Sequence, residues 1–236
     1  MSANSALIAF TDSNPKDVLR AYPVLDKPAT KDLAERLFPG AQIAEIGDEL
    51  LVDALNPPED IAYLGCFGAL DLVCSWKIMP DRPSQLDPAV LGATVRRNTY
   101  LYALHADADW CSFGLWQDGE LVRAYSACPD PGVIEDIGAR LSFEQTYETY
   151  DELGDAVLEA FFGIDQSNDA ENDDVDPEMI PVVGYRVSPH QGGARAAGAG
   201  SGGRQDQGGA RAAGAGWQDQ PSADEERPQV ALGDRQ

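Results

Sequence analysis

The chain has 236 residues and carries 40 acidic against 17 basic side chains, which gives a formal net charge of −23. A surface this negative repels a phosphate backbone, so nucleic-acid binding through a basic face is not expected. The same field attracts basic partners and favours solubility. No apolar run approaches the roughly 18 residues of a membrane span, and none forms a signal segment. We therefore expect a cytoplasmic protein with no membrane partner and with its 4 cysteines reduced.

The first 40 residues predict a strand followed by two helices. Residues 5–10, "SALIAF", are a short apolar run that ends in a cluster typical of turns and helix caps. Asn14 is the expected N-cap of a helix over "PKDVLRAYP", whose Pro15 suits a first helical turn. A second helix is predicted over "ATKDLAERLFPG", with Thr30 as N-cap and a stop at Pro39-Gly40.

From residue 41 the pattern alternates with a period of two, which is typical of strands. "AQIAEI" and "LLVDAL" are predicted as two strands around a Gly47-Asp48 turn, and "IAYLGCF" and "LDLVCSW" as two more across Gly68. Residues 100–106 supply a further strand. The short connections favour antiparallel pairing.

A Pro-rich segment, "MPDRPSQLDP" (79–88), follows these strands. Loops on a rigid scaffold often carry binding residues, so Arg82 is a candidate contact for a ligand or partner. The alternative is a structural loop that closes over the sheet edge and is stiffened by its prolines.

The segment "WCSFGLWQDGELVRAYSAC" predicts a β-hairpin, because Asp-Gly between alternating residues is a strong hairpin signal. A two-residue turn pairs Gln117 with Glu120, Trp116 with Leu121 and Gly114 with Arg123. One face then carries Trp110, Ser112, Trp116, Leu121, Arg123 and Tyr125. The other face, assigned to the core, carries Cys111, Phe113, Leu115, Val122, Ala124 and Cys128.

The first of these faces is a candidate partner-binding surface formed by Trp110, Trp116, Arg123 and Tyr125. A guanidinium stacked on aromatic rings gains about 0.5–2 kcal/mol, and such patches are enriched at protein interfaces. The alternative is a sheet face covered by a helix, with the arginine reaching the edge.

The end of the globular part predicts a helix over 151–163, with Gly163 at its C-cap, and a returning strand in "MIPVVGYRV". Pro181 places that strand at a sheet edge, because proline cannot donate to a ladder. The fold class is therefore α+β: a mainly antiparallel β-sheet covered by three or four helices.

The acidic stretch "DQSNDAENDDVD" (165–176) places Asp165, Asp169 and Asp176 at positions 1, 5 and 12 of an EF-hand-like loop. Ala170 stands where the sharp turn needs glycine, and Pro177 disfavours an exiting helix. The two interpretations are weak Ca²⁺ binding and a solvated acidic loop.

Composition changes near Ser188, after which Gly, Ala, Gln, Arg and Asp dominate. The decapeptide "QGGARAAGAG" occurs at 191–200 and again at 207–216. Alanine and glycine cannot bury enough apolar surface to offset the entropy of ordering the chain. We expect one globular domain over 1–187 and a disordered tail over 188–236.

The stretches "MPDRPSQL", "DWCSFGLWQDGELVRAYS" and "PDPGVIEDIG", followed by "LSFE", resemble a family of actinobacterial proteins classed as a domain of unknown function. "SALIAFTD" and "LAERLFPG" are similar to it as well, so the resemblance covers about residues 5–187. It implies a single domain over 1–187, and it implies no activity, cofactor or catalytic residue.

No familiar catalytic or metal motif is present in 1–187. The four cysteines have no C-x2-C pair, and His105 is the only histidine of this part, so no metal or other cofactor is predicted. The sequence has no G-x-S-x-G nucleophile elbow and no glycine-rich phosphate loop.

These observations lead to a non-catalytic acidic protein that binds a protein partner with a basic surface. Residues 1–187 hold 12 basic and 34 acidic side chains, so most of the charge belongs to this part. The alternative is an enzyme of unrecognised type that uses Arg82, His105 and a carboxylate such as Asp107 or Asp109 in one pocket. Ca²⁺ binding by 165–176 is the third possibility.

Overall fold

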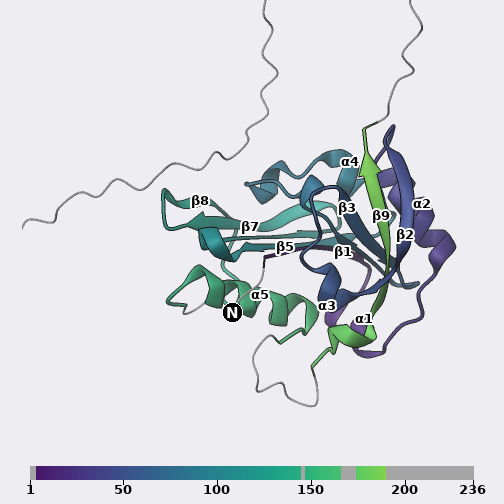
Figure 1. Ribbon diagram of the computed structural model, residues 1–236. Coiled ribbons are helices and arrows are strands. Elements are labelled where there is room, and N and C mark those ends of the chain that lie inside the picture. The colour runs from purple at the N-terminus through teal and green to yellow at the C-terminus, as the bar shows by residue number, and fades with distance from the viewer. Residues whose placement is uncertain (1–3, 145–146, 166–173, 190–236) are drawn as a thin grey trace, which may run out of the picture. The chain divides into compact units, whose positions relative to one another are not determined.

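The computed structural model describes residues 4–144, 147–165 and 174–189, and these build one antiparallel sheet with helices on both faces (Figure 1). The strand order is β2-β9-β3-β4-β1-β5-β6-β7-β8, with every neighbouring pair antiparallel. The strands are β1 (Ser5–Thr11), β2 (Gln42–Leu50), β3 (Ile61–Cys66), β4 (Leu70–Cys74), β5 (Asn98–His105), β6 (Trp110–Gln117), β7 (Glu120–Cys128), β8 (Gly132–Ile137) and β9 (Pro181–Ser188). The predicted antiparallel sheet with added helices is confirmed, but the described residues form five α-helices where three or four were predicted.

The α-helices are α1 (Pro15–Arg20), α2 (Lys27–Leu37), α3 (Leu51–Ala54), α4 (Pro88–Leu91) and α5 (Tyr150–Phe162). The predicted cap of α1 is confirmed, because the Asn14 side chain accepts a hydrogen bond from the Lys16 backbone N–H. Helix α5 ends as predicted at Gly163, whose φ of 72° places it in the left-handed region.

The predicted start of α2 at Thr30 is wrong. The helix begins a turn earlier, because Asp26 is the N-cap and accepts from the Ala29 N–H at 3.0 Å. Pro28 occupies the first turn, where its missing N–H costs no bond. The Thr30 hydroxyl is buried and donates instead to the Asp26 carbonyl.

The predicted pair of strands around Gly47-Asp48 is a single strand, β2, followed by the short helix α3. Gly47 has a φ of 123°, and the register of the pairing with β9 shifts at a bulge between Glu45 and Gly47. The glycine therefore bends one strand where a turn was predicted.

The predicted edge position of the last strand is also wrong. β9 lies inside the sheet, between β2 and β3. Pro181 is its first residue, so the missing N–H falls at the end of the ladder, where it is tolerated.

Two hydrophobic clusters lie on opposite faces of the sheet. The first packs α1, α3 and α5 against β1, β5 and β6, and Figure 1 shows these three helices on the same side. The second buries residues of α2 and α4 against the other face. Within the described residues, no helix combines the length and the apolar character needed to cross a membrane. From residue 190 onward, the predicted tail lies outside the described residues.

Candidate functional site

The predicted β6–β7 hairpin forms, but its register changes after two residue pairs. Asp118 and Gly119 both have positive φ, and the pairs Gln117–Glu120 and Trp116–Leu121 are confirmed. A bulge then makes Leu115, and not Gly114, the partner of Arg123. Because successive side chains alternate between faces, this shift moves every later residue of β7 to the opposite side of the sheet.

The predicted surface of Trp110, Trp116, Arg123 and Tyr125 is therefore not a single face. Tyr125 belongs to the first hydrophobic cluster with Phe113, whereas Trp116 belongs to the second. Arg123 is 0%, Trp116 4% and Tyr125 4% exposed, and Trp110 is half-buried. The stacking of Arg123 on rings does occur, with its guanidinium carbon 5.8 Å from the Phe113 centroid and 5.4 Å from that of Tyr125.

Arg123 is held in a buried ion pair. Its Nε and Nη2 donate to the Glu144 carboxylate at 3.0 and 2.6 Å, and its Nη1 donates to Asp136. Burial lowers the pKa of Arg123, but its bonds to the two carboxylates outweigh burial and raise the pKa above its ordinary value. These contacts fix the segment after β8 onto β7 and leave the guanidinium no exposed surface for a partner.

Arg82 is exposed, but its Nη1 donates to the Ile134 carbonyl of β8 at 2.6 Å. Two residues later, the Ser84 hydroxyl donates to Glu135 at 2.6 Å. Both contacts attach the Pro-rich loop to the edge strand of the sheet. This arrangement fits the structural alternative for the loop, and a ligand contact by Arg82 stays a prediction.

His105 ends β5, half-buried, with its ring centroid 6.1 Å from that of Trp76. Its Nδ1 and the Asp109 Oδ1 are buried without hydrogen-bond partners among the described residues. Neither residue lines the pocket described below, and neither does Arg82. The residues of the predicted enzyme site thus do not meet in this pocket.

The cysteines are free thiols in a mostly buried setting: Cys66, Cys74 and Cys111 are buried, and Cys128 is half-buried. Burial raises the pKa of the Cys74 and Cys111 thiols well above the ordinary range. The described residues contain no group of three or more His, Cys, Asp or Glu side chains placed to hold a metal. Thiols this buried and this weakly acidic are poor nucleophiles.

The loop predicted for Ca²⁺ lies partly outside the described residues, since 166–173, with Asp169, is not described. Asp176 accepts a hydrogen bond from the Glu178 N–H at 2.9 Å and so caps the short 3-10 helix over Pro177–Met179. Asp165 is half-buried at the end of α5. Ca²⁺ binding by this loop stays a prediction.

Asp155 of α5 is a half-buried carboxylate, and its Oδ1 has no hydrogen-bond partner within the described part of the chain. Burial, and then the charges of Asp151 and Asp165, raise its pKa above 3.8. The folded state therefore holds this proton more tightly than the unfolded state. It follows that the Asp155 contribution to stability declines as pH rises from about 3.8 through the folded pKa.

We expect Asp155→Asn to raise the melting temperature at pH 7 and to change it little near pH 3.5. Thermal unfolding followed by circular dichroism at both pH values measures this difference. Glu159→Gln is the control, because Glu159 is exposed on the same helix. An equal gain at both pH values would contradict the assignment.

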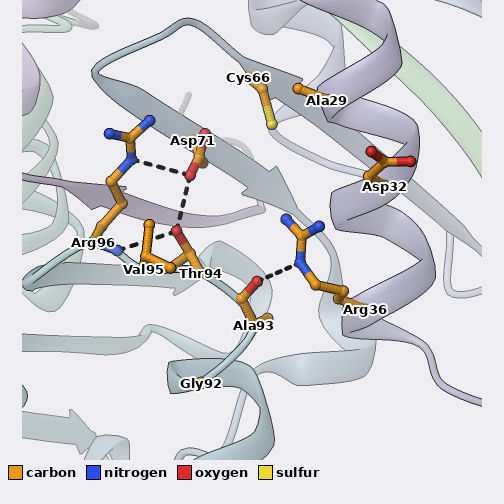
Figure 2. A pocket seen from close by; sticks show the side chains of 10 residues that line it. All are labelled: Ala29, Asp32, Arg36, Cys66, Asp71, Gly92, Ala93, Thr94, Val95 and Arg96. Carbon is orange, nitrogen blue, oxygen red and sulfur yellow. Dashed lines mark hydrogen bonds and ion pairs between the residues drawn. The ribbon is translucent and has the colours of Figure 1, made fainter.

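A pocket with a volume of about 480 Å³ lies between α2 and the loop that precedes β5 (Figure 2). Its walls combine charged and polar groups with small side chains. The lining residues are Ala29, Asp32, Arg36, Cys66, Asp71, Gly92, Ala93, Thr94, Val95 and Arg96. The pocket is open to solvent, because Asp32, Arg36, Gly92 and Val95 are exposed.

Asp71 of β4 is the buried acidic group of this pocket. Its Oδ2 accepts from the Thr94 hydroxyl at 3.0 Å and from the Arg96 Nε at 3.3 Å. Arg96 also donates through Nη1 to Asp12 and through Nη2 to the Gly68 carbonyl, so each nitrogen of its guanidinium has an acceptor. Burial and the adjacent Asp71 carboxylate raise the pKa of the Cys66 thiol to about 12, although the Arg36 charge opposes them.

The pocket was not predicted, since its members come from four separate segments. The only local signal was the pair of arginines in "TVRRN" (94–98), which stands out in so acidic a chain. Nothing in the sequence relates this loop to Arg36 on α2 or to Asp71 on β4.

A second feature is an exposed border of the sheet that we name the acidic edge. It combines carboxylates with exposed apolar side chains on β2 and α3: Glu45, Ile46, Asp48, Glu49, Leu50, Val52 and Asp53. Ile46 is 42%, Leu50 39% and Val52 40% exposed. Among the described residues, Asp48 pairs with Lys27 at 2.5 Å, and no ion pair holds Glu45, Glu49 or Asp53.

The field of these carboxylates acts on two neighbouring tyrosines. Burial, and then the charges of Glu45 and Asp48 among others, raise the pKa of Tyr185 to about 12. Burial, Glu49 and Asp53 likewise raise the pKa of Tyr63. The carboxylates of the acidic edge therefore act on one tyrosine at each hydrophobic cluster, Tyr63 at the first and Tyr185 at the second.

Residues 5–151 match the model of a family of unknown function, DUF6928. The chain belongs to this family. The DUF6928 match is shorter than the predicted resemblance over 5–187, and it stops at the start of α5. β9 lies beyond it, although this strand joins β2 to β3. No curated protein and no solved structure matches the chain.

Proposed function

We propose that this DUF6928 protein is a non-catalytic acidic protein that binds a protein partner with a basic surface, and that it does so through the acidic edge. The observation that supports this function most directly is the set of carboxylates without ion pairs on β2 and α3. Glu45 and Asp53 are exposed and Glu49 is half-buried, and no ion pair among the described residues includes any of the three. A partner cation would meet three negative charges there.

The acidic edge also carries exposed apolar side chains, which could contact a partner. Ile46, Leu50 and Val52 lie among the acids in the segment 45–53. Interfaces combine apolar contact, which supplies affinity, with complementary charge, which supplies orientation and fast association. A basic segment with interleaved apolar residues has the matching chemistry.

Two features disfavour pairing between copies of this chain at the same edge. The bulge at Gly47 interrupts the regular ladder of β2, and bulges and charges are common protections of edge strands. A second copy would also bring its own Glu45, Asp48 and Glu49 against the first. Like charges placed together are repulsive, so a basic partner is favoured.

The proposal is tested by affinity purification of the full chain at low and high salt, with a triple variant of the acidic edge, Glu45→Gln/Glu49→Gln/Asp53→Asn. We expect a basic protein that is retained at low salt and released at high salt, because exposed charges are screened by salt. The edge variant should lose this protein even at low salt.

The matched control is Asp17→Asn/Glu120→Gln/Glu159→Gln, which removes three exposed carboxylates elsewhere on the domain. Retention by this control together with loss by the edge variant supports the acidic edge. Equal loss from both variants would show a nonspecific charge effect, and retention that ignores salt would contradict the proposal as a whole.

A further inference from the structure

The guanidinium of Arg36 lines the pocket of Figure 2 and has hydrogen-bond donors left free by the described residues. The residue is exposed, and its Nε donates to the Ala93 carbonyl at 2.7 Å, which restrains the side chain. Figure 2 shows both Nη atoms pointing away from Ala93, toward the side of the pocket where Cys66 lies. Neither Nη atom has an acceptor within the described residues, and no ion pair includes Arg36.

Such a guanidinium is a receptor for a carboxylate. Two Nη groups can donate in parallel to the two oxygens of a carboxylate, and this fork geometry is specific to arginine. Because Ala93 already holds the side chain, little conformational freedom is lost when a ligand binds. The Arg36 charge also reaches Cys66, since it acts to lower the pKa of that thiol.

Negative charge lies on both walls of the pocket. Asp71, on the wall opposite Arg36, is 7% exposed and is oriented by Thr94 and Arg96, while Asp32 is exposed on α2, one helical turn before Arg36. Figure 2 shows Asp32 and Arg36 on the same helix, with Asp71 across the pocket from them. The four charged side chains of the lining, two arginines and two aspartates, sum to zero.

The balance of positive and negative side chains in the lining determines which anionic ligands are favoured. A phosphate dianion on Arg36 would face the Asp32 and Asp71 carboxylates, while the single charge of Arg96 is already shared between Asp71 and Asp12. A ligand with both a carboxylate and an ammonium group satisfies both walls at once. We propose that this pocket binds a small zwitterion, the chemical class of the free α-amino acids, with its carboxylate on Arg36 and its ammonium group on the aspartate side.

The test is isothermal titration calorimetry of the full chain with each of the twenty standard amino acids. Three control ligands are propionate, which has no ammonium group, ethylamine, which has no carboxylate, and inorganic phosphate, which has a different anionic group. We expect saturable binding of at least one amino acid, and binding of propionate and ethylamine weaker by about tenfold or more, because each loses one charged anchor.

Two variants locate the site. Arg36→Gln should abolish the binding, and Arg36→Lys, which keeps the charge but not the fork, should weaken it by about tenfold. Lys31→Gln is the control, because Lys31 is exposed on the same helix outside the lining. Circular dichroism verifies that each variant folds.

Absence of saturable binding for all twenty amino acids at millimolar concentration would overturn the proposal. So would tighter binding of phosphate than of any amino acid, or unchanged binding to Arg36→Gln.

Discussion

Replacement of Arg123 by methionine should destabilise the domain by about 3–5 kcal/mol, since it leaves the Glu144 carboxylate buried without its cation. Arg123 is 0% exposed, and its guanidinium also bonds to the Ile137 and Gly138 carbonyls at 2.9 and 3.3 Å. Methionine fills much of the same space but supplies no donor. Urea unfolding followed by tryptophan fluorescence measures the loss.

Two further variants separate the ion pair from packing. The double variant Arg123→Met/Glu144→Leu removes both charges and should recover most of the lost stability, because a buried pair replaced by apolar residues is often neutral. Arg140→Met is the control, since Arg140 is exposed in the same segment, and its effect should stay within about 0.5 kcal/mol. If the double variant is no more stable than Arg123→Met, the buried charge is not the cause.

Gly138→Ala should be the second strongly destabilising change. Gly138 has a φ of 86°, and an added Cβ would collide with the backbone carbonyl of Val122, which cannot rotate away. The positive φ costs about 1–3 kcal/mol, and displacement of the packed backbone costs about 1–3 kcal/mol more. Thermal and urea unfolding of the variant measure the sum.

Gly132→Ala is its matched control. Gly132 has a φ of 93° at the other end of β8, but an added Cβ there meets no atom within 4 Å. This variant should show only the cost of the backbone conformation. Equal losses for the two variants would mean that the contact with Val122 contributes nothing.

Local chemistry explains which elements could be predicted. The Asp118-Gly119 turn, the Asn14 cap and the Gly163 C-cap each depend on residues within a few positions of each other. The pairing of β3 with β4 across Gly68 is of the same kind. Short-range steric and hydrogen-bond preferences act equally in any fold, so the sequence reveals them.

The failures share a different cause. The register of the β6–β7 pair shifts between Trp116 and Leu115, and the first residue of β7 paired after this shift is Arg123. The ion-pair partner of Arg123, Glu144, lies 21 residues further along the chain. No pattern within the hairpin distinguishes the observed register from the regular one. Because the regular register was assumed, the prediction placed Arg123 and Tyr125 on the same face as Trp116.

The interior place of β9 was hidden for a related reason. Pro181 signalled an edge, yet at the first position of the strand it interrupts nothing. Only the pairing of β2 and β3 on either side of β9 shows that the strand is internal. Sheet order is a long-range property, and the sequence contains little local information about it.

By itself, the sequence determined the negative charge, the hairpin turn, two helix ends and an antiparallel α+β class, because each follows from composition or from neighbouring residues. Tertiary structure decided the bulge that buries Arg123 and the strand order that exposes the acidic edge. It also brought Arg36, Asp71 and Arg96 together around one pocket. Such juxtapositions arise from contacts between distant segments, whose free energy depends on the whole fold and not on any one stretch of chain.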